Sequence, residues 1–160
     1  MLSFAPRLYV RIHPDRLTVR DPGSGAFLQE PPLIAISQDP KAVILAVGGE
    51  ADSLRGRPEV RVINPFSHPR TPISDFTAGE QLVKAMVKKL LGRRLFALSP
   101  VMVMHLAMKL EGGITQIEAR ALHEMGIGAG ASRVLCWVGP DLTDEQVREL
   151  EFPPTGEVVA

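Results

Sequence analysis

The residues with the most chemical potential in this sequence are four histidines and one cysteine. His13, His68, His105 and His123 fall in a predicted turn, loop, strand and helix, and no two have the i, i+4 spacing of helical metal ligands. Cys136 has no second cysteine with which to form a C-x-x-C pair. We therefore expect no metal site. Because His105 and Cys136 lie within apolar runs, we interpret both as core residues rather than as a ligand and a nucleophile.

Glycine-rich phosphate loops are the second kind of chemistry to consider. Neither G-x-x-x-x-G-K-[ST] nor G-x-G-x-x-G occurs, and no G-x-S-x-G motif presents a serine nucleophile. Residues 126–130 hold three glycines, but they follow a predicted helix instead of opening one. Their pattern is typical of a helix end and a tight turn. The sequence thus predicts no cofactor.

A cluster of basic residues marks the end of the longest predicted helix, and two interpretations of it stay open. It is either a solvated face with cations near a helix C-terminus, or a docking surface for an acidic partner or anionic lipid. The whole chain is neutral, with 18 basic and 18 acidic residues, so we expect no nucleic acid partner. The cluster comprises Lys84, Lys88, Lys89, Arg93 and Arg94.

Length and composition describe an ordinary globular domain. The chain has 160 residues, of which 45% are hydrophobic and 22% charged. A single cysteine fits a reducing compartment. The longest apolar run, Ala42 to Val47, is far shorter than the about 20 residues of a membrane span, and the first residues lack the pattern of a signal peptide. We expect a cytoplasmic protein.

The elements that must position these residues follow from hydrophobic periodicity and turn signals. Three short alternating segments predict an antiparallel meander, and further apolar runs predict strands, among them a buried strand at 43–47. The predicted strands are 8–12, 17–20, 26–28, 33–36, 43–47, 60–63, 101–106 and 134–138.

Predicted helices alternate with the later strands. A short helix is expected at 50–56, a long one at 77–91 with a capping box from Thr77 to Glu80, a third opened by Thr115 and Glu118, and a last one from Thr143 to about Leu150. Strands that alternate with helices pair in parallel. The predicted fold is α/β: a mixed sheet with a three-strand antiparallel meander and then parallel strands, with helices on both faces. We expect one domain over 1–151 and a disordered tail over 152–160.

Several strings together resemble the MreB family, the bacterial actin-like rod shape-determining proteins. They occur in the family's order and cover nearly the whole chain. The resemblance implies an actin-like, ribonuclease H-like fold corresponding to the family's domain I. The matching segments are Leu28–Ile36 (family LNEPSVVAI), Ala46–Ala51 (AVG..A), Leu54–Arg57 (MLGR), Ile73–Phe76 (VIADF), Ile114–Ala121 (ATQVERRA) and Gly128–Ala131 (GAGA).

The same resemblance locates a departure at the family's first phosphate loop. Where the family has DLGTANT, this chain places Arg11 at the metal-serving aspartate and His13-Pro14 at the Gly-Thr pair. A guanidinium cannot hold Mg²⁺, and proline has no amide N–H to donate. Glu118 aligns with the family's water-activating glutamate, but it also sits at position N3 of the capping box that begins at Thr115.

These residues lead to three alternative functions. The first is a non-catalytic scaffold or interaction module of the cell-shape cytoskeleton, without ATPase activity, that binds a protein partner or itself. The alternative is a nucleotide-binding or ATPase module that completes its site with another subunit, with Glu118 as the catalytic candidate. A third possibility is membrane association through Met1–Phe4 and the basic helix end.

Overall fold

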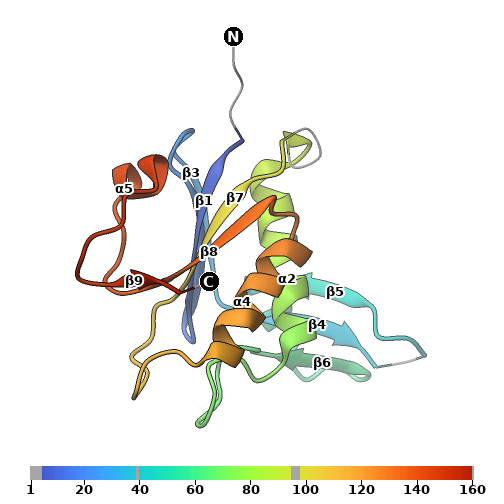
Figure 1. The fold of residues 1–160 in the computed structure, drawn as a ribbon. Coiled ribbons are helices and arrows are strands. Elements are labelled where there is room, and N and C mark those ends of the chain that lie inside the picture. The colour runs from blue at the N-terminus through green and yellow to red at the C-terminus, as the bar shows by residue number, and fades with distance from the viewer. Residues whose placement is uncertain (1–4, 39, 95–97, 160) are drawn as a thin grey trace.

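The protein is described by a computed structural model that covers residues 5–38, 40–94 and 98–159. Its main feature is a six-stranded sheet in the order β3-β2-β1-β7-β8-β9 (Figure 1). The first three strands form the predicted antiparallel meander, and β7 and β8 then add in parallel. The strands are β1 (Arg7–His13), β2 (Arg16–Asp21), β3 (Ala26–Glu30), β7 (Val101–Leu106), β8 (Arg133–Val138) and β9 (Glu157–Val158).

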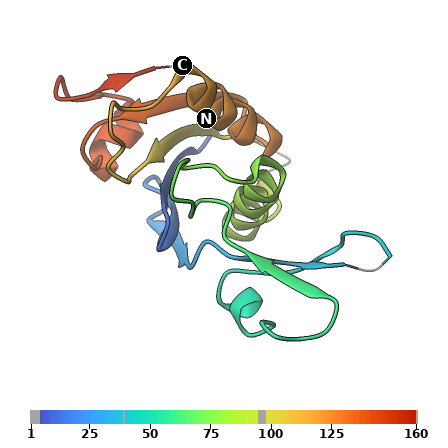
Figure 2. The same cartoon turned by 90° about the horizontal axis from the view of Figure 1, so that it is seen from below.

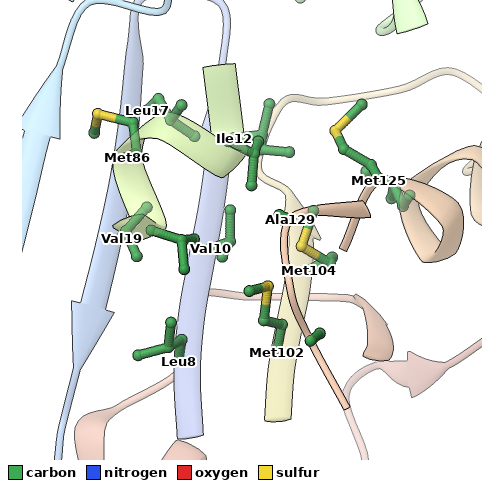
Figure 3. Close-up of a cluster of buried hydrophobic side chains, with 14 of the residues drawn as sticks. Leu8, Val10, Ile12, Leu17, Val19, Met86, Met102, Met104, Met125 and Ala129 are labelled. Atoms are coloured by element: carbon green, nitrogen blue, oxygen red, sulfur yellow. The ribbon is translucent and has the colours of Figure 1, made fainter. Parts of the chain in front are cut away.

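Helices cover both faces of this sheet, as predicted. α2 (Phe76–Leu91) and α4 (Gln116–Gly128) pack on one face, and the short α5 (Asp144–Glu149) lies on the other (Figure 1). Between the sheet and the two long helices lies the main core of aliphatic and methionine side chains, part of which is drawn in Figure 3. Its members include Leu8, Val10, Ile12, Met86, Met102, Met104 and Met125.

The opposite face of the sheet holds a second, smaller core. Tyr9 and Trp137 are its largest members, and α5 contributes Val147. The helix α5 is fixed at its start by a capping box in which Thr143 and Gln146 exchange hydrogen bonds. This face carries the polar contacts described below.

A separate three-stranded sheet projects from the main body, in the order β5-β4-β6 (Figure 2). It consists of β4 (Ile34–Ser37), β5 (Ile44–Val47) and β6 (Val60–Ile63), with the single-turn helix α1 (Gly49–Asp52) beside it. The prediction of a buried strand at 43–47 is wrong. The strand β5 is at the edge of this sheet: its first half, Ile44 and Leu45, is exposed, whereas Ala46 and Val47 are half-buried, Ala46 against the cluster that contains Ala51 of α1.

Capping boxes were predicted at the starts of two helices, α2 and α4, and the structure contains only the one at α4. The long helix α2 is capped by Asp75, whose side chain accepts a 3.0 Å hydrogen bond from the backbone N–H of Ala78, so the predicted capping box at Thr77 is wrong. The carboxyl group of Glu80 lies over Gly128 of α4 instead of reaching back to Thr77. The predicted capping box at the start of α4 is confirmed.

The segment after Leu150 differs from the predicted disordered tail. Phe152 stacks on Trp137 with ring centroids 5.4 Å apart, and β9 pairs with β8. The backbone N–H of Val159 donates to the carbonyl of Cys136 over 2.9 Å. The segment after Leu150 therefore pairs with the edge of β8 that β7 leaves open. The composition of this segment, rich in turn residues, did not predict this pairing.

Candidate functional site

Glu118 lies at the rim of a cavity of about 530 Å³ next to the β1–β2 turn. The cavity is bounded by Pro14 of that turn, by the loop after β6, by the loop after β7 and by the start of α4. The structure thus brings the turn and Glu118, which are about a hundred residues apart in the chain, to one place. Other lining residues are Phe66, His68, Arg70, Lys109, Glu111 and Thr115.

The Glu118 side chain is already engaged in holding the start of α4. Its carboxylate accepts a 2.8 Å hydrogen bond from the backbone N–H of Thr115, and the Thr115 hydroxyl accepts one from the Glu118 N–H over 3.1 Å. One of its two carboxylate oxygens makes this contact. The other oxygen accepts no hydrogen bond from the residues that the structure describes, so Glu118 combines a structural role with a free acceptor at the cavity.

The β1–β2 turn has its own internal contacts. The Pro14 carbonyl accepts a 2.8 Å hydrogen bond from the side-chain amide of Asn64, and the Asp15 N–H donates to Nδ1 of His13 over 3.1 Å. Proline brings no N–H, and the Asp15 N–H is occupied, so these two amides do not point free into the cavity. The residues present therefore do not form a phosphate cradle by themselves.

Arg11 lies on the opposite face of the sheet from the main core, away from the Glu118 cavity. Its Nε donates to a carboxylate oxygen of Asp141 over 2.9 Å. Arg20 lies on the neighbouring strand β2, opposite Tyr9, and its Nε donates to Asp144 over 3.1 Å. Its guanidinium lies 5.2 Å from the ring centroid of Phe27. These arginines border an open cavity of about 430 Å³.

The arginine-bordered cavity was not predicted from the sequence. The side chains come from alternate positions of β1 and β2, and only the strand register places them together. The partners Asp141 and Asp144 follow more than a hundred residues later, just before and at the start of α5. The only signal in the sequence is the alternation of arginine with apolar residues along both strands.

His105 and Cys136 are confirmed as core residues. Both side chains are buried, and burial lowers the pKa of His105 and raises the pKa of the Cys136 thiol to about 11. His105 bonds on one side to the Tyr9 hydroxyl and on the other to the Gly139 carbonyl. The Cys136 sulfur contacts the Ala119 carbonyl at 3.5 Å.

The basic end of α2 is partly tied to the sheet. Arg94 donates to the buried carboxylate of Asp21 over 3.3 Å, and Lys89 lies 3.9 Å from Glu30. These ion pairs give two of the five cations a role within the fold. The alternative of a docking surface concerns the remaining ones and stays a prediction.

Metal ligands and membrane spans were also considered. In residues 5–38, 40–94 and 98–159, no three His, Cys, Asp or Glu side chains gather as a metal site would need. Over the same ranges, none of the helices combines the length and hydropathy needed to cross a membrane. The segment Met1–Phe4, invoked above for membrane association, lies outside the described residues.

The fold is that of actin-like proteins. Two crystal structures of MreB5 of Spiroplasma citri, one bound to ADP and one bound to AMPPNP, match 81% of this chain with TM-scores of 0.62 and 0.56. The sequence identity is 19% in both cases, and the match covers 37% and 38% of those chains. This likeness confirms the predicted architecture.

The chain belongs to the MreB/Mbl protein family, whose model matches residues 16–140. The cell shape-determining protein MreB of Escherichia coli K12 is 33% identical over 118 residues, which cover 70% of this chain. MreB of Pasteurella multocida is 32% identical over 117 residues. The matched region is 32% of the length of either relative, so the chain spans about one third of them.

These comparisons contradict the prediction that the protein is not an enzyme. That prediction rested on the altered segment at Arg11, His13 and Pro14. The chain is nevertheless a member of the MreB/Mbl family, and the MreB5 structures that share its fold hold ADP and AMPPNP. The altered turn is therefore no ground for excluding ATPase activity.

Proposed function

We propose that this protein is an interaction module of the bacterial cell-shape cytoskeleton, working in the cytoplasm by association with a second copy of itself or with another protein. The observation that carries the proposal is the family match over residues 16–140. The curated relatives are cell shape-determining proteins. The chain spans about one third of their length.

The surface of the structure supports an interaction role. Eight large hydrophobic side chains are exposed among the described residues, and three of them, Val43, Ile44 and Leu45, are consecutive. Scattered exposed apolar side chains are ordinary, whereas a contiguous group on a projecting element is typical of a contact surface. The small sheet that carries them stands away from the main body (Figure 2).

Sedimentation velocity tests the proposal. The protein would be run alone over a range of concentrations and then mixed with purified MreB of Escherichia coli. We expect a species heavier than the 17.4 kDa monomer in at least one of the two experiments. A monomer at all concentrations that also leaves the sedimentation of MreB unchanged contradicts the proposal.

A second candidate function is a nucleotide-binding or ATPase module whose site is completed by another subunit. The specific observation in its favour is the cavity that joins the β1–β2 turn to Glu118, with one carboxylate oxygen of Glu118 free of the capping contact. The turn offers few free amides, so phosphate ligands would have to come from the other polypeptide. Glu118 would there accept a proton from the attacking water.

This candidate function requires a second subunit to complete the site and Glu118 to act in hydrolysis, and both requirements are tested with MgATP. We expect no binding tighter than about 100 μM to the chain alone, equivalent to about −5.5 kcal/mol, and hydrolysis only in the presence of the completing subunit. Glu118→Gln keeps a capping side chain at N3 and should abolish that hydrolysis. Glu111→Gln, which changes a carboxylate of the same cavity, is the matched control and should retain it. Equal activity of both variants contradicts the role of Glu118.

A further inference from the structure

Three consecutive exposed apolar side chains lie at the start of β5: Val43, which precedes the strand, and Ile44 and Leu45 within it. Val43, Ile44 and Leu45 have exposed fractions of 53%, 42% and 47%. They belong to an uninterrupted apolar run, Ala42 to Val47, without a charged or hydrogen-bonding side chain. One edge of β5 pairs with β4, and the other is the free edge of the small sheet.

The other edge strands of the two sheets carry polar or charged side chains. β3 contains Gln29 and Glu30, β6 contains Arg61, and β9 contains Glu157. Charged residues on an edge strand hinder pairing with another chain. In contrast, β5 carries no charged side chain, and the six-residue apolar run that contains it, Ala42 to Val47, has the composition of strands that pair with one another.

The pairing of β5 with β4 contains an irregularity at Leu45. Ala35 faces Ala46 and Ile36 faces Ile44, so Leu45 is an extra residue without a Cα partner in β4. Leu45 thus contributes exposed apolar surface while taking no place in the register with β4. A substitution there leaves the paired residues of the small sheet intact.

We propose that β5 pairs antiparallel with β5 of a second copy of this chain, about a two-fold axis, joining two small sheets into one continuous sheet. This inference rests on the proposed function and names its interface. A self-complementary contact of this kind is what a two-fold axis requires. Full overlap of Ile44–Val47 sets Ile44 opposite the partner's Val47, and Leu45 opposite the partner's Ala46.

Charge favours a second copy over an unrelated partner. Lys41 and Glu50 lie at equal distances along the chain from the middle of β5, on opposite sides of it. Both are exposed. Under the two-fold axis, Lys41 of each copy comes to the end of the strand where the partner's Glu50 lies. Opposite charges at both ends select the antiparallel orientation, since parallel pairing would bring like charges together.

The size of the contact sets its strength. A pair of four-residue strands is smaller than a standard protein interface, so we expect weak, reversible association. Light scattering coupled to size exclusion should show a mass that rises with concentration from 17.4 kDa toward twice that value.

Variants of β5 test the location. Leu45→Lys should remain monomeric at every concentration. Ile117→Lys, which places the same charge on an exposed apolar residue of α4, should dimerise as the wild type does. Thermal unfolding of both variants checks that they are folded. A wild-type chain that stays monomeric, or a Leu45→Lys variant that still dimerises, overturns the inference.

A charge exchange tests the orientation. Lys41→Glu and Glu50→Lys should each weaken self-association several-fold, and an equimolar mixture of the two variants should restore it as a heterodimer. No restoration overturns the antiparallel arrangement. Self-association that survives all β5 variants would leave the proposed function standing and refute only this interface, whereas failure of both self-association and binding to MreB refutes both.

Discussion

The hydroxyl of Tyr9 on β1 donates a hydrogen bond to Nδ1 of His105 on the neighbouring strand β7, with oxygen and nitrogen 2.6 Å apart. The other ring nitrogen, Nε2, lies 2.9 Å from the Gly139 carbonyl, which can only accept, so Nε2 carries the proton. The Tyr9 oxygen in turn accepts from the Leu142 N–H. This chain links β1 and β7 to the segment before α5 and is satisfied by a neutral histidine.

Stability should therefore fall in mild acid through His105. Burial lowers the pKa of His105 in the folded state below its ordinary value of 6.5, so as the pH falls the unfolded chain takes up this proton first. The free energy of unfolding then decreases as the pH falls below about 6.5. Denaturant unfolding between pH 7.5 and pH 5 should show a steeper decrease for the wild type than for His105→Gln. At pH 7.5 the variant should be less stable by about 1–3 kcal/mol, because buried hydrogen bonds are lost.

His68→Gln is the matched control for this effect. His68 is exposed in the loop after β6, so the same substitution there removes an imidazole without disturbing the buried hydrogen bonds of His105. Equal slopes for the wild type and His105→Gln would show that His105 does not carry the acid sensitivity.

The capping role of Glu118 predicts a contrast between two substitutions. Glu118→Gln preserves an acceptor at N3 and should change the free energy of unfolding by less than about 0.5 kcal/mol, whereas Glu118→Ala removes the bond to the Thr115 N–H and should cost about 1 kcal/mol. Chemical denaturation measures both. Thr115→Ala removes the reciprocal bond and should cost a similar amount; equal stability of the glutamine and alanine variants would refute the cap.

The packing of the C-terminal segment predicts a fluorescence change. Phe152 stacks on Trp137, the one tryptophan of the chain, so Phe152→Ala should expose the indole, shift its emission to longer wavelength and reduce stability by about 1–2 kcal/mol. Gly156→Ala should act alike, since a Cβ there would lie 2.6 Å from an indole carbon. Thr155→Ala, at an exposed position of the same turn, is the control. Unchanged emission in both variants would mean that this segment does not cover Trp137.

Much of the fold follows from local patterns. The order of strands and helices is readable because parallel strands need helical crossovers, and the capping boxes at Thr115 and Thr143 involve residues only three positions apart. The core positions of His105 and Cys136 follow from their apolar neighbours. Each of these features was predicted from residues that lie close together in the sequence.

Other features depend on partners far along the chain, and the sequence did not predict them. Val43 to Val47 has the composition of a buried strand, and only the topology shows that β5 is an edge strand whose first residues are exposed. Glu80 has the spacing of a capping residue, but the approach of α4 draws its carboxyl group to Gly128. The pairing of Arg11 with Asp141 joins residues 130 positions apart. The resemblance located Arg11 without indicating its partner.

The contact between α4 and β8 provides a last prediction, in which two effects compete. Replacing a helical glycine by alanine ordinarily stabilises a helix by about 1 kcal/mol. At Gly126, however, a Cβ would lie 2.6 Å from a methyl carbon of Val134, which is buried and has a stiff, β-branched side chain. Overpacking of this kind costs about 1–3 kcal/mol, so Gly126→Ala should be net destabilising by about 1 kcal/mol in denaturant unfolding.

Val134→Ala removes the obstructing methyl groups and should itself be destabilising through the space it leaves. The double variant should then be more stable than the sum of the two single effects, since the new methyl group fills part of that space. Strict additivity would show that α4 and β8 do not meet at these two residues.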